Sequence, residues 1–157
     1  MVLVFVGDRN VVERNFERVL RADREVGALS EEYESMLRKI VPVSFSTGPL
    51  GLGRLAKSLV VAFRRVVRPT PELPAQDKRF WLAKQTMLSA MNVMLAAHAA
   101  GLATVPMEGF DETRVKRLLS IRGHCDVILV MPIGFAEGPA PIKTRLPLDA
   151  MVHSDCW

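Results

Sequence analysis

The sequence of 157 residues contains two cysteines, one tyrosine and no apolar run long enough to cross a bilayer, which takes about 20 residues. Cys125 and Cys156 are too few for a disulfide scaffold and lack a C-x-x-C spacing. We therefore expect a reducing, cytoplasmic environment. The apolar opening at residues 2–6 is too short for a signal peptide, and we expect no membrane partner.

The sequence does contain enough apolar material for a sizeable core. Hydrophobic residues make up 49% of the chain, together with 10 glycines and 10 prolines. This composition predicts a single globular domain over residues 1–157. The formal net charge of +4 favours anionic ligands, including nucleotide-type cofactors, but identifies none of them.

Strand-like and helix-like segments follow one another along the chain. Apolar, β-rich runs predict strands at residues 2–6, 102–106 and 126–134, and a short additional strand at 41–46. Helices are expected after Asn10, from Ser30 to Ile40, at 54–68, at 77–100 and after Asp111. This order predicts an α/β (α+β) fold in which helices cover a central sheet.

The longest predicted helix, at residues 77–100, is apolar on most sides, which indicates burial on most sides. Gln85, Ser89 and Asn92 follow at i, i+4 and i+7 and form one polar stripe. The stripe can face a cofactor or a partner subunit. Packing of this helix in a plain core or a subunit interface is the simpler interpretation.

Other motifs give weaker signals. The helix at residues 54–68 carries five basic residues, and we interpret it as a solvated basic face rather than a membrane or nucleic-acid surface. We therefore expect no nucleic-acid partner. His124, Cys125 and Asp126 are consecutive, and consecutive strand residues point to opposite faces, so we expect no metal site there.

A predicted turn between a strand and a helix carries a stronger functional signal. It consists of Pro106, Met107, Glu108 and Gly109. Gly109 lacks a Cβ, so the backbone can approach a flat ligand closely and offer its amide groups as donors.

An extended segment near the C-terminus complements this turn. Lys143 and Arg145 are two residues apart, so their side chains leave the same side of the extended chain and can converge on one phosphate. Together, the turn and this pair predict a cradle for flavin mononucleotide (FMN).

The order and spacing of these motifs resemble the nitroreductase family of FMN-dependent oxidoreductases. The similar segments are residues 81–85, 101–102, 106–111, 127–134 and 143–148. The resemblance implies a nitroreductase-like fold with a long buried helix. It also implies that Pro106, Met107, Glu108 and Gly109 lie at the flavin ring and that Lys143 and Arg145 bind the phosphate.

The resemblance further implies a reaction and a partner. Electrons would pass from NADH or NADPH through FMN to a nitroaromatic, a quinone or a similar small-molecule acceptor. Because the flavin carries this chemistry, no catalytic side chain of the protein is expected. The family also implies a homodimer with the flavin at the subunit interface.

One part of the family pattern has no counterpart in this sequence. Family members carry an Arg-x-Ser-x-Arg phosphate-binding set before the strand that corresponds to residues 2–6. The expectation is therefore an N-terminally shortened, incomplete nitroreductase-like domain. A second hypothesis stays open, in which a truncated or flavin-deficient relative acts as a binding or interaction module.

Overall fold

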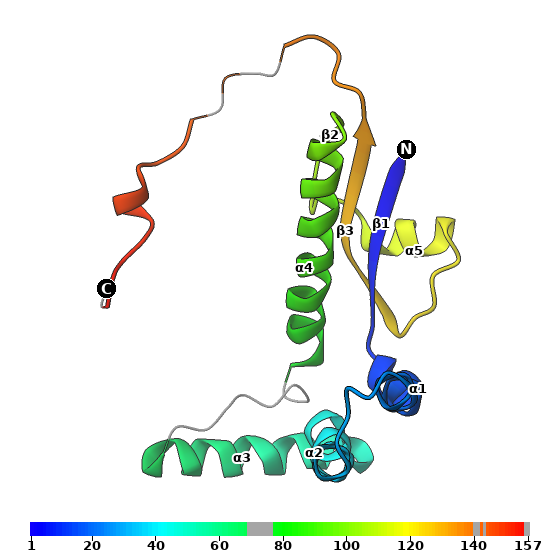
Figure 1. Cartoon of the computed structure of the whole chain (residues 1–157), viewed down its shortest axis with the longest axis vertical. Helices are drawn as coiled ribbons and strands as arrows, with labels where there is room; N and C mark the ends of the chain where they lie inside the picture. The colour runs from blue at the N-terminus through cyan, green and yellow to red at the C-terminus, as the bar shows by residue number, and fades with distance from the viewer. Residues whose placement is uncertain (69–76, 140–141, 143, 156–157) are drawn as a thin grey trace.

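The structure is a computed structural model that describes residues 1–68, 77–139, 142 and 144–155. Three strands form one antiparallel sheet (Figure 1). β3 (Cys125–Gly134) is the middle strand, β1 (Val2–Asp8) pairs with one side of it, and the short β2 (Ala103–Thr104) pairs with the other. The three strands predicted by the apolar runs are confirmed.

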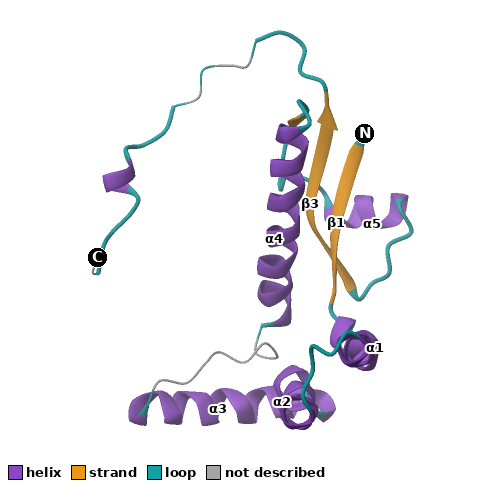
Figure 2. Ribbon diagram, in the orientation of Figure 1, coloured by secondary structure: helices purple, strands orange, loops and turns teal. Residues whose placement is uncertain are grey.

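The long helix α4 (Lys78–Ala99) lies along one face of this sheet (Figure 2). Every second residue of β3 from Leu129 to Ile133 is buried in the core that the strand forms with this helix: Leu129, Met131 and Ile133. This spacing is the period of two expected for a strand with one face in a core. The helix contributes Ala90 and Ala97 to the same core, and these small side chains let helix and sheet pack closely.

Gly7 shows how closely β1 and α4 approach. A Cβ added to Gly7 would lie 3.2 Å from the Cβ of Leu82, tighter than ordinary van der Waals contact. At the other end of the helix, Gly101 has φ +73° and directly follows the last turn. That conformation suits a glycine at the C-terminal end of a helix.

Only one side of α4 is buried within the described chain. Leu88, Met91 and Leu95 are exposed on the side away from the sheet, and the polar residues Gln85 and Ser89 are exposed beside β1. Within a single chain, α4 is therefore not buried on most sides, contrary to what the sequence had led us to expect. The physical reason is that the sheet covers one face of the helix and no second layer of the described residues covers the other.

Three helices lie beyond the end of β1 (Figure 1): α1 (Val11–Glu25), α2 (Glu31–Phe45) and α3 (Leu52–Val67). A short 3₁₀ turn, η1 (Pro49–Gly51), precedes α3. Arg38 of α2 pairs with Glu17 of α1 at 2.6 Å and with Glu34 at 2.8 Å. The hydroxyl of Ser30 accepts a hydrogen bond from the N–H of Tyr33, which caps the start of α2.

The predicted strand at residues 41–46 is wrong, because α2 continues as a helix through Phe45. Pro42 lies inside this helix, where its missing N–H removes one backbone hydrogen bond. The helix persists because its last turn has tertiary contacts. The ring of Phe45 packs edge to face against Trp81 of α4, with the ring centroids 4.9 Å apart.

The helix α5 (Glu112–Leu118) packs against β3 and lies on the other side of the strands from α4 in Figure 1. Asp111 caps it by accepting a hydrogen bond from the N–H of Arg114. The described residues that follow β3 include the 3₁₀ turn η3 (Leu148–Ala150). Among the described helices, none combines the length and apolar character needed to cross a membrane.

Candidate functional site

The candidate site is the turn that follows β2, and the sheet holds its first half in place. The N–H of Val105 donates to the carbonyl of Pro132 at 3.1 Å. Met107 and Val130 exchange two backbone hydrogen bonds, of 2.9 and 3.1 Å. The chain thus stays on the edge of β3 up to Met107, and the turn begins from a fixed point.

The second half of the turn is open to solvent. Pro106, Glu108 and Gly109 are exposed, and the N–H of Phe110 donates to the carbonyl of Glu108 at 3.0 Å, which closes the turn. Within the described part of the chain, the backbone N–H groups of Glu108 and Gly109 have no hydrogen-bond partner. Two adjacent donors are therefore available to a ligand.

The fold itself does not require a glycine at position 109. Its φ lies outside the left-handed region, and a Cβ placed there would meet no atom of the described chain within 4 Å. Gly7, in contrast, is packed against α4. The missing side chain at Gly109 leaves free space directly beside the two unpaired donors, which is the space that a flat ligand needs.

Only Arg145 of the predicted phosphate-binding pair is among the described residues. Arg145 is exposed, and its guanidinium donates to the carbonyl of its neighbour Thr144 at 2.9 Å. Lys143 lies outside the described residues. Among those that are described, no hydrogen bond or ion pair joins Arg145 to residues 106–109. The roles of Lys143 and Arg145 stay predictions.

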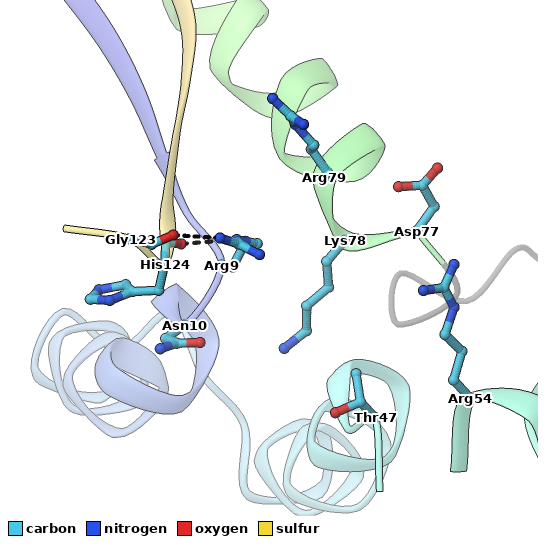
Figure 3. Close-up of a pocket in the computed structure, with 9 residues that line it drawn as sticks. All are labelled: Arg9, Asn10, Thr47, Arg54, Asp77, Lys78, Arg79, Gly123 and His124. Atoms are coloured by element: carbon cyan, nitrogen blue, oxygen red, sulfur yellow. Dashed lines mark hydrogen bonds between the residues drawn. The ribbon is translucent and has the colours of Figure 1, made fainter. Parts of the chain in front are cut away.

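A cavity of about 570 Å³ that the sequence did not indicate lies where β1, α3 and α4 come together (Figure 3). Its cationic lining residues are Arg9, Arg54, Lys78 and Arg79. Three of them are already engaged: Arg9 donates to backbone carbonyls, Lys78 pairs with Glu13 at 2.8 Å, and Arg79 pairs with Glu112 at 2.6 Å. These contacts hold segments together and leave little free charge for a ligand.

The buried carboxylate of Asp126 is a second feature near this cavity. Asp126 is 4% exposed, and Arg9, Arg79 and Lys116 approach it at 3.4, 3.8 and 3.8 Å. Each cation comes from a different segment of the chain. Asp126 therefore acts as a structural centre that ties β3 to its neighbours, and sequence spacing alone gave no sign of it.

These features occur in a chain that is similar to proteins of one known family. The family model described as the nitroreductase family matches residues 5–135. The chain is 32% identical over 94 residues to an oxygen-insensitive NAD(P)H nitroreductase of Salmonella typhimurium. This match covers 55% of this chain and 42% of that protein. The chain spans well under half the length of the curated relatives it matches.

Solved structures agree on the fold. A nitroreductase family protein of Streptococcus pneumoniae superposes with a TM-score of 0.67 at 21% identity, over 98% of this chain and 63% of that one. A protein of Exiguobacterium sibiricum, solved in complex with FMN, gives a TM-score of 0.65 at 17% identity, over 98% of this chain and 61% of that one. The fold class predicted from sequence is thus confirmed, and the chain belongs to the nitroreductase family.

Proposed function

We propose that this chain is an FMN-dependent oxidoreductase that passes electrons from NADH or NADPH to a nitroaromatic, a quinone or a similar small-molecule acceptor. The observation that carries the proposal is the open turn at Gly109, in a chain of the nitroreductase family. Two backbone donors that are unpaired among the described residues border a space that no atom of those residues fills.

The turn fits the edge of a flavin ring. When bound, FMN supplies the redox chemistry, and the protein needs to hold the ring and stabilise the negative charge that it gains on reduction. The N–H groups of Glu108 and Gly109 would donate to that edge. Met107 cannot join them, because its N–H is already bonded to Val130. Its role is to hold the donors in a fixed position.

Lys143 and Arg145 would bind the phosphate of FMN. Both belong to the tail that follows β3, and the exposed guanidinium of Arg145 has free donors beyond its bond to Thr144. Hydrogen bonds between charged groups contribute about 1.5–3 kcal/mol each. Two of them are enough to change FMN affinity by more than tenfold, since about 1.4 kcal/mol corresponds to a factor of ten.

A homodimer belongs to the same proposal. Leu88, Met91 and Leu95 are 64%, 50% and 56% exposed and follow at i, i+3 and i+7 on one side of α4. An apolar helix side of this kind loses contact with water when a second copy covers it, which stabilises the pair. The stripe of Gln85, Ser89 and Asn92 would border that interface.

The second candidate function is that of a flavin-free relative that works as an interaction module. The observation in its favour is α3, where Leu55, Leu59 and Phe63 are exposed along one side of a helix that also carries basic residues. Such a surface suits a protein partner. The two candidates differ in one measurable property, which is the binding of FMN.

Titration of the purified full chain with FMN, followed by visible absorbance, tests the proposal. We expect saturable binding that weakens at least about tenfold in the variant Lys143→Ala/Arg145→Ala. The matched control is Arg64→Ala/Arg65→Ala, which removes the same charge from α3 and should leave FMN affinity unchanged. Absence of binding by the folded chain would favour the interaction module, and an equal loss in the control would show that Lys143 and Arg145 do not bind the phosphate specifically.

A further inference from the structure

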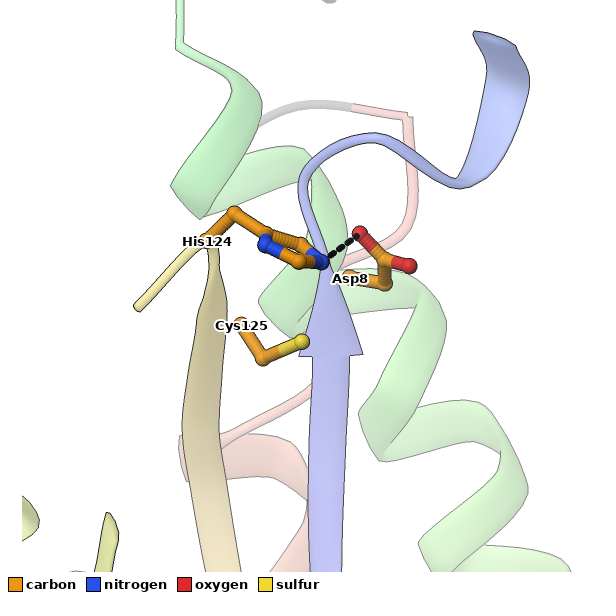
Figure 4. Close-up of side chains that lie close together, drawn as sticks. All are labelled: Asp8, His124 and Cys125. Atoms are coloured by element: carbon orange, nitrogen blue, oxygen red, sulfur yellow. Dashed lines mark ion pairs between the residues drawn. The ribbon is translucent and has the colours of Figure 1, made fainter. Parts of the chain in front are cut away.

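The ends of β1 and β3 bring together three side chains that are able to bind a metal ion (Figure 4). Asp8 is the last residue of β1, Cys125 is the first residue of β3, and the antiparallel register places them opposite each other. His124 directly precedes Cys125. One oxygen, one nitrogen and one sulfur from these residues all lie within 4.8 Å of one another.

The strand boundary explains why two adjacent residues can reach one point. Consecutive residues inside a strand point to opposite faces, and on that ground the sequence predicted no shared site. His124, however, lies just outside β3 and is not held in the pleat. Its ring turns toward Asp8, with Nε2 3.6 Å from Oδ1, while Cys125 points into the same space (Figure 4).

Nε2 of His124 has an unmet bonding requirement. This atom is buried, yet among the described residues it has no hydrogen-bond partner, since 3.6 Å to Asp8 is too long for one. A buried polar atom without a partner is uncommon in folded proteins. The nitrogen of a neutral imidazole satisfies this requirement by binding a metal ion.

The carboxylate of Asp8 is already oriented for the same purpose. Its Oδ1 accepts a hydrogen bond of 2.8 Å from the N–H of Asn10, and its Oδ2 accepts one of 3.0 Å from Arg14. Oδ1 keeps a second lone pair and lies 3.6 Å from Nε2 of His124. Hydrogen bonds of this kind orient the ligands of metal sites from outside the first coordination sphere.

We propose that Asp8, His124 and Cys125 bind one divalent transition-metal ion of the zinc class. Nitrogen, sulfur and carboxylate oxygen are the ligands of tetrahedral Zn²⁺, at about 2.0–2.3 Å from the ion. Ligand atoms of one such site lie up to about 4 Å apart, so the observed cluster needs only small side-chain rotations. Binding releases the thiol proton of Cys125 to solvent, and a water molecule completes the fourth position.

This site is separate from the proposed flavin site. Met107 pairs with Val130, and Val130 lies about 17 Å along β3 from Cys125 at about 3.4 Å per residue. Metal binding and FMN binding can therefore be measured independently, and failure of one does not imply failure of the other.

Titration of the untagged, reduced full chain with Co²⁺ tests the site, because cobalt bound to thiolate gives a charge-transfer absorption band. We expect one Co²⁺ per chain, displaced by Zn²⁺. The band should disappear in Cys125→Ser, and affinity should fall at least about tenfold in His124→Gln and Asp8→Asn. Cys156→Ser and His98→Gln are the matched controls and should bind cobalt as the unmodified chain does.

A second measurement does not depend on the cobalt absorption band, and it also reports on variants that fold poorly. Zn²⁺ should raise the melting temperature of the unmodified chain, because the three proposed ligands come together only in the folded state, and this rise should be absent in His124→Gln. Circular dichroism checks the fold of each variant. A band that persists in Cys125→Ser, or an unmodified chain with neither band nor rise, would overturn the proposal and leave a simple contact between His124 and Asp8.

Discussion

The side chain of Glu112 is bonded to the middle strand β3, because its Oε1 accepts a hydrogen bond of 3.1 Å from the backbone N–H of Val127. Val127 is 5% exposed, so water cannot easily replace this acceptor. Glu112 also pairs with Lys116 at 2.7 Å and with Arg79 at 2.6 Å. One residue of α5 thus joins the middle strand to α4.

Replacement of Glu112 tests this link. We expect Glu112→Ala to lower the free energy of unfolding by about 1–3 kcal/mol, because it leaves the buried N–H of Val127 without an acceptor. Glu112→Gln keeps an acceptor oxygen and should lower the free energy of unfolding by less than Glu112→Ala does. Urea denaturation followed by circular dichroism measures both, and equal losses in the two variants would show that charge, not the bond to Val127, matters.

Acid should weaken the same link. The hydrogen bond from Lys116, then that from the N–H of Val127 and the charge of Arg79, hold the pKa of Glu112 below its usual 4.5. Because the folded-state pKa is lowered, this stabilisation is fully present above about pH 4.5 and is lost as the pH falls through the lower folded-state value. The free energy of unfolding should therefore fall with pH less steeply in Glu112→Gln than in the unmodified chain.

Glu17 and Glu34 act in the same direction. The hydrogen bond from Arg38 lowers the pKa of Glu17, and the hydrogen bonds from Arg24 and Arg38 lower the pKa of Glu34. Both carboxylates thus add to the loss of stability in acid, and neither is changed in Glu112→Gln. If the free energy of unfolding depended on pH identically in the unmodified chain and in Glu112→Gln, Glu112 would not contribute to the loss of stability in acid.

A methyl group at position 109 should separate folding from ligand binding. In Gly109→Ala, the new Cβ meets no atom of the described chain, so stability should hold or rise by about 0.4–1 kcal/mol. FMN affinity should fall at least about tenfold, because the methyl group enters the space proposed for the ring. Gly123→Ala is the control, since its Cβ also meets no atom of the described residues. Unchanged FMN affinity in Gly109→Ala would place the flavin elsewhere.

A charge on the outer side of α4 should prevent dimerisation. In Met91→Glu, association would bury an unpaired carboxylate, and we expect the dimer dissociation constant to rise at least about 100-fold. Leu59→Glu adds the same charge to the exposed apolar side of α3 and serves as control. Analytical ultracentrifugation measures the mass; a monomeric unmodified chain, or a dimer that tolerates Met91→Glu, would argue against this interface.

The sequence predicted most elements of the fold because their signals are local. Asp111 accepts the backbone hydrogen bond expected of a cap, whereas Asn10 precedes α1 without a side-chain cap bond. The apolar run at residues 126–134 likewise needs no distant information to indicate a strand. The failure at residues 41–46 has a non-local cause, because the β-branched residues there favour a strand while the contact of Phe45 with Trp81 supports a helix.

The two candidate sites also differ in whether their sequence signal is local. The turn at residues 106–109 could be predicted from its own residues, since a glycine beside a strand end is a local signal. The cluster of Asp8 with His124 and Cys125 could not, because it depends on the register of β1 against β3. That register joins residues more than 100 positions apart and becomes visible only in the folded chain.

Anaerobic reduction of the FMN-loaded chain tests the proposed function most directly. Addition of NADH or NADPH should bleach the visible absorbance of bound FMN, and a nitroaromatic added afterwards should restore it, because the electrons then leave the flavin. Free FMN at equal concentration, without protein, is the control. If bound FMN stayed oxidised with both nucleotides while the chain remained folded, the proposal that this chain is an NAD(P)H oxidoreductase would be contradicted.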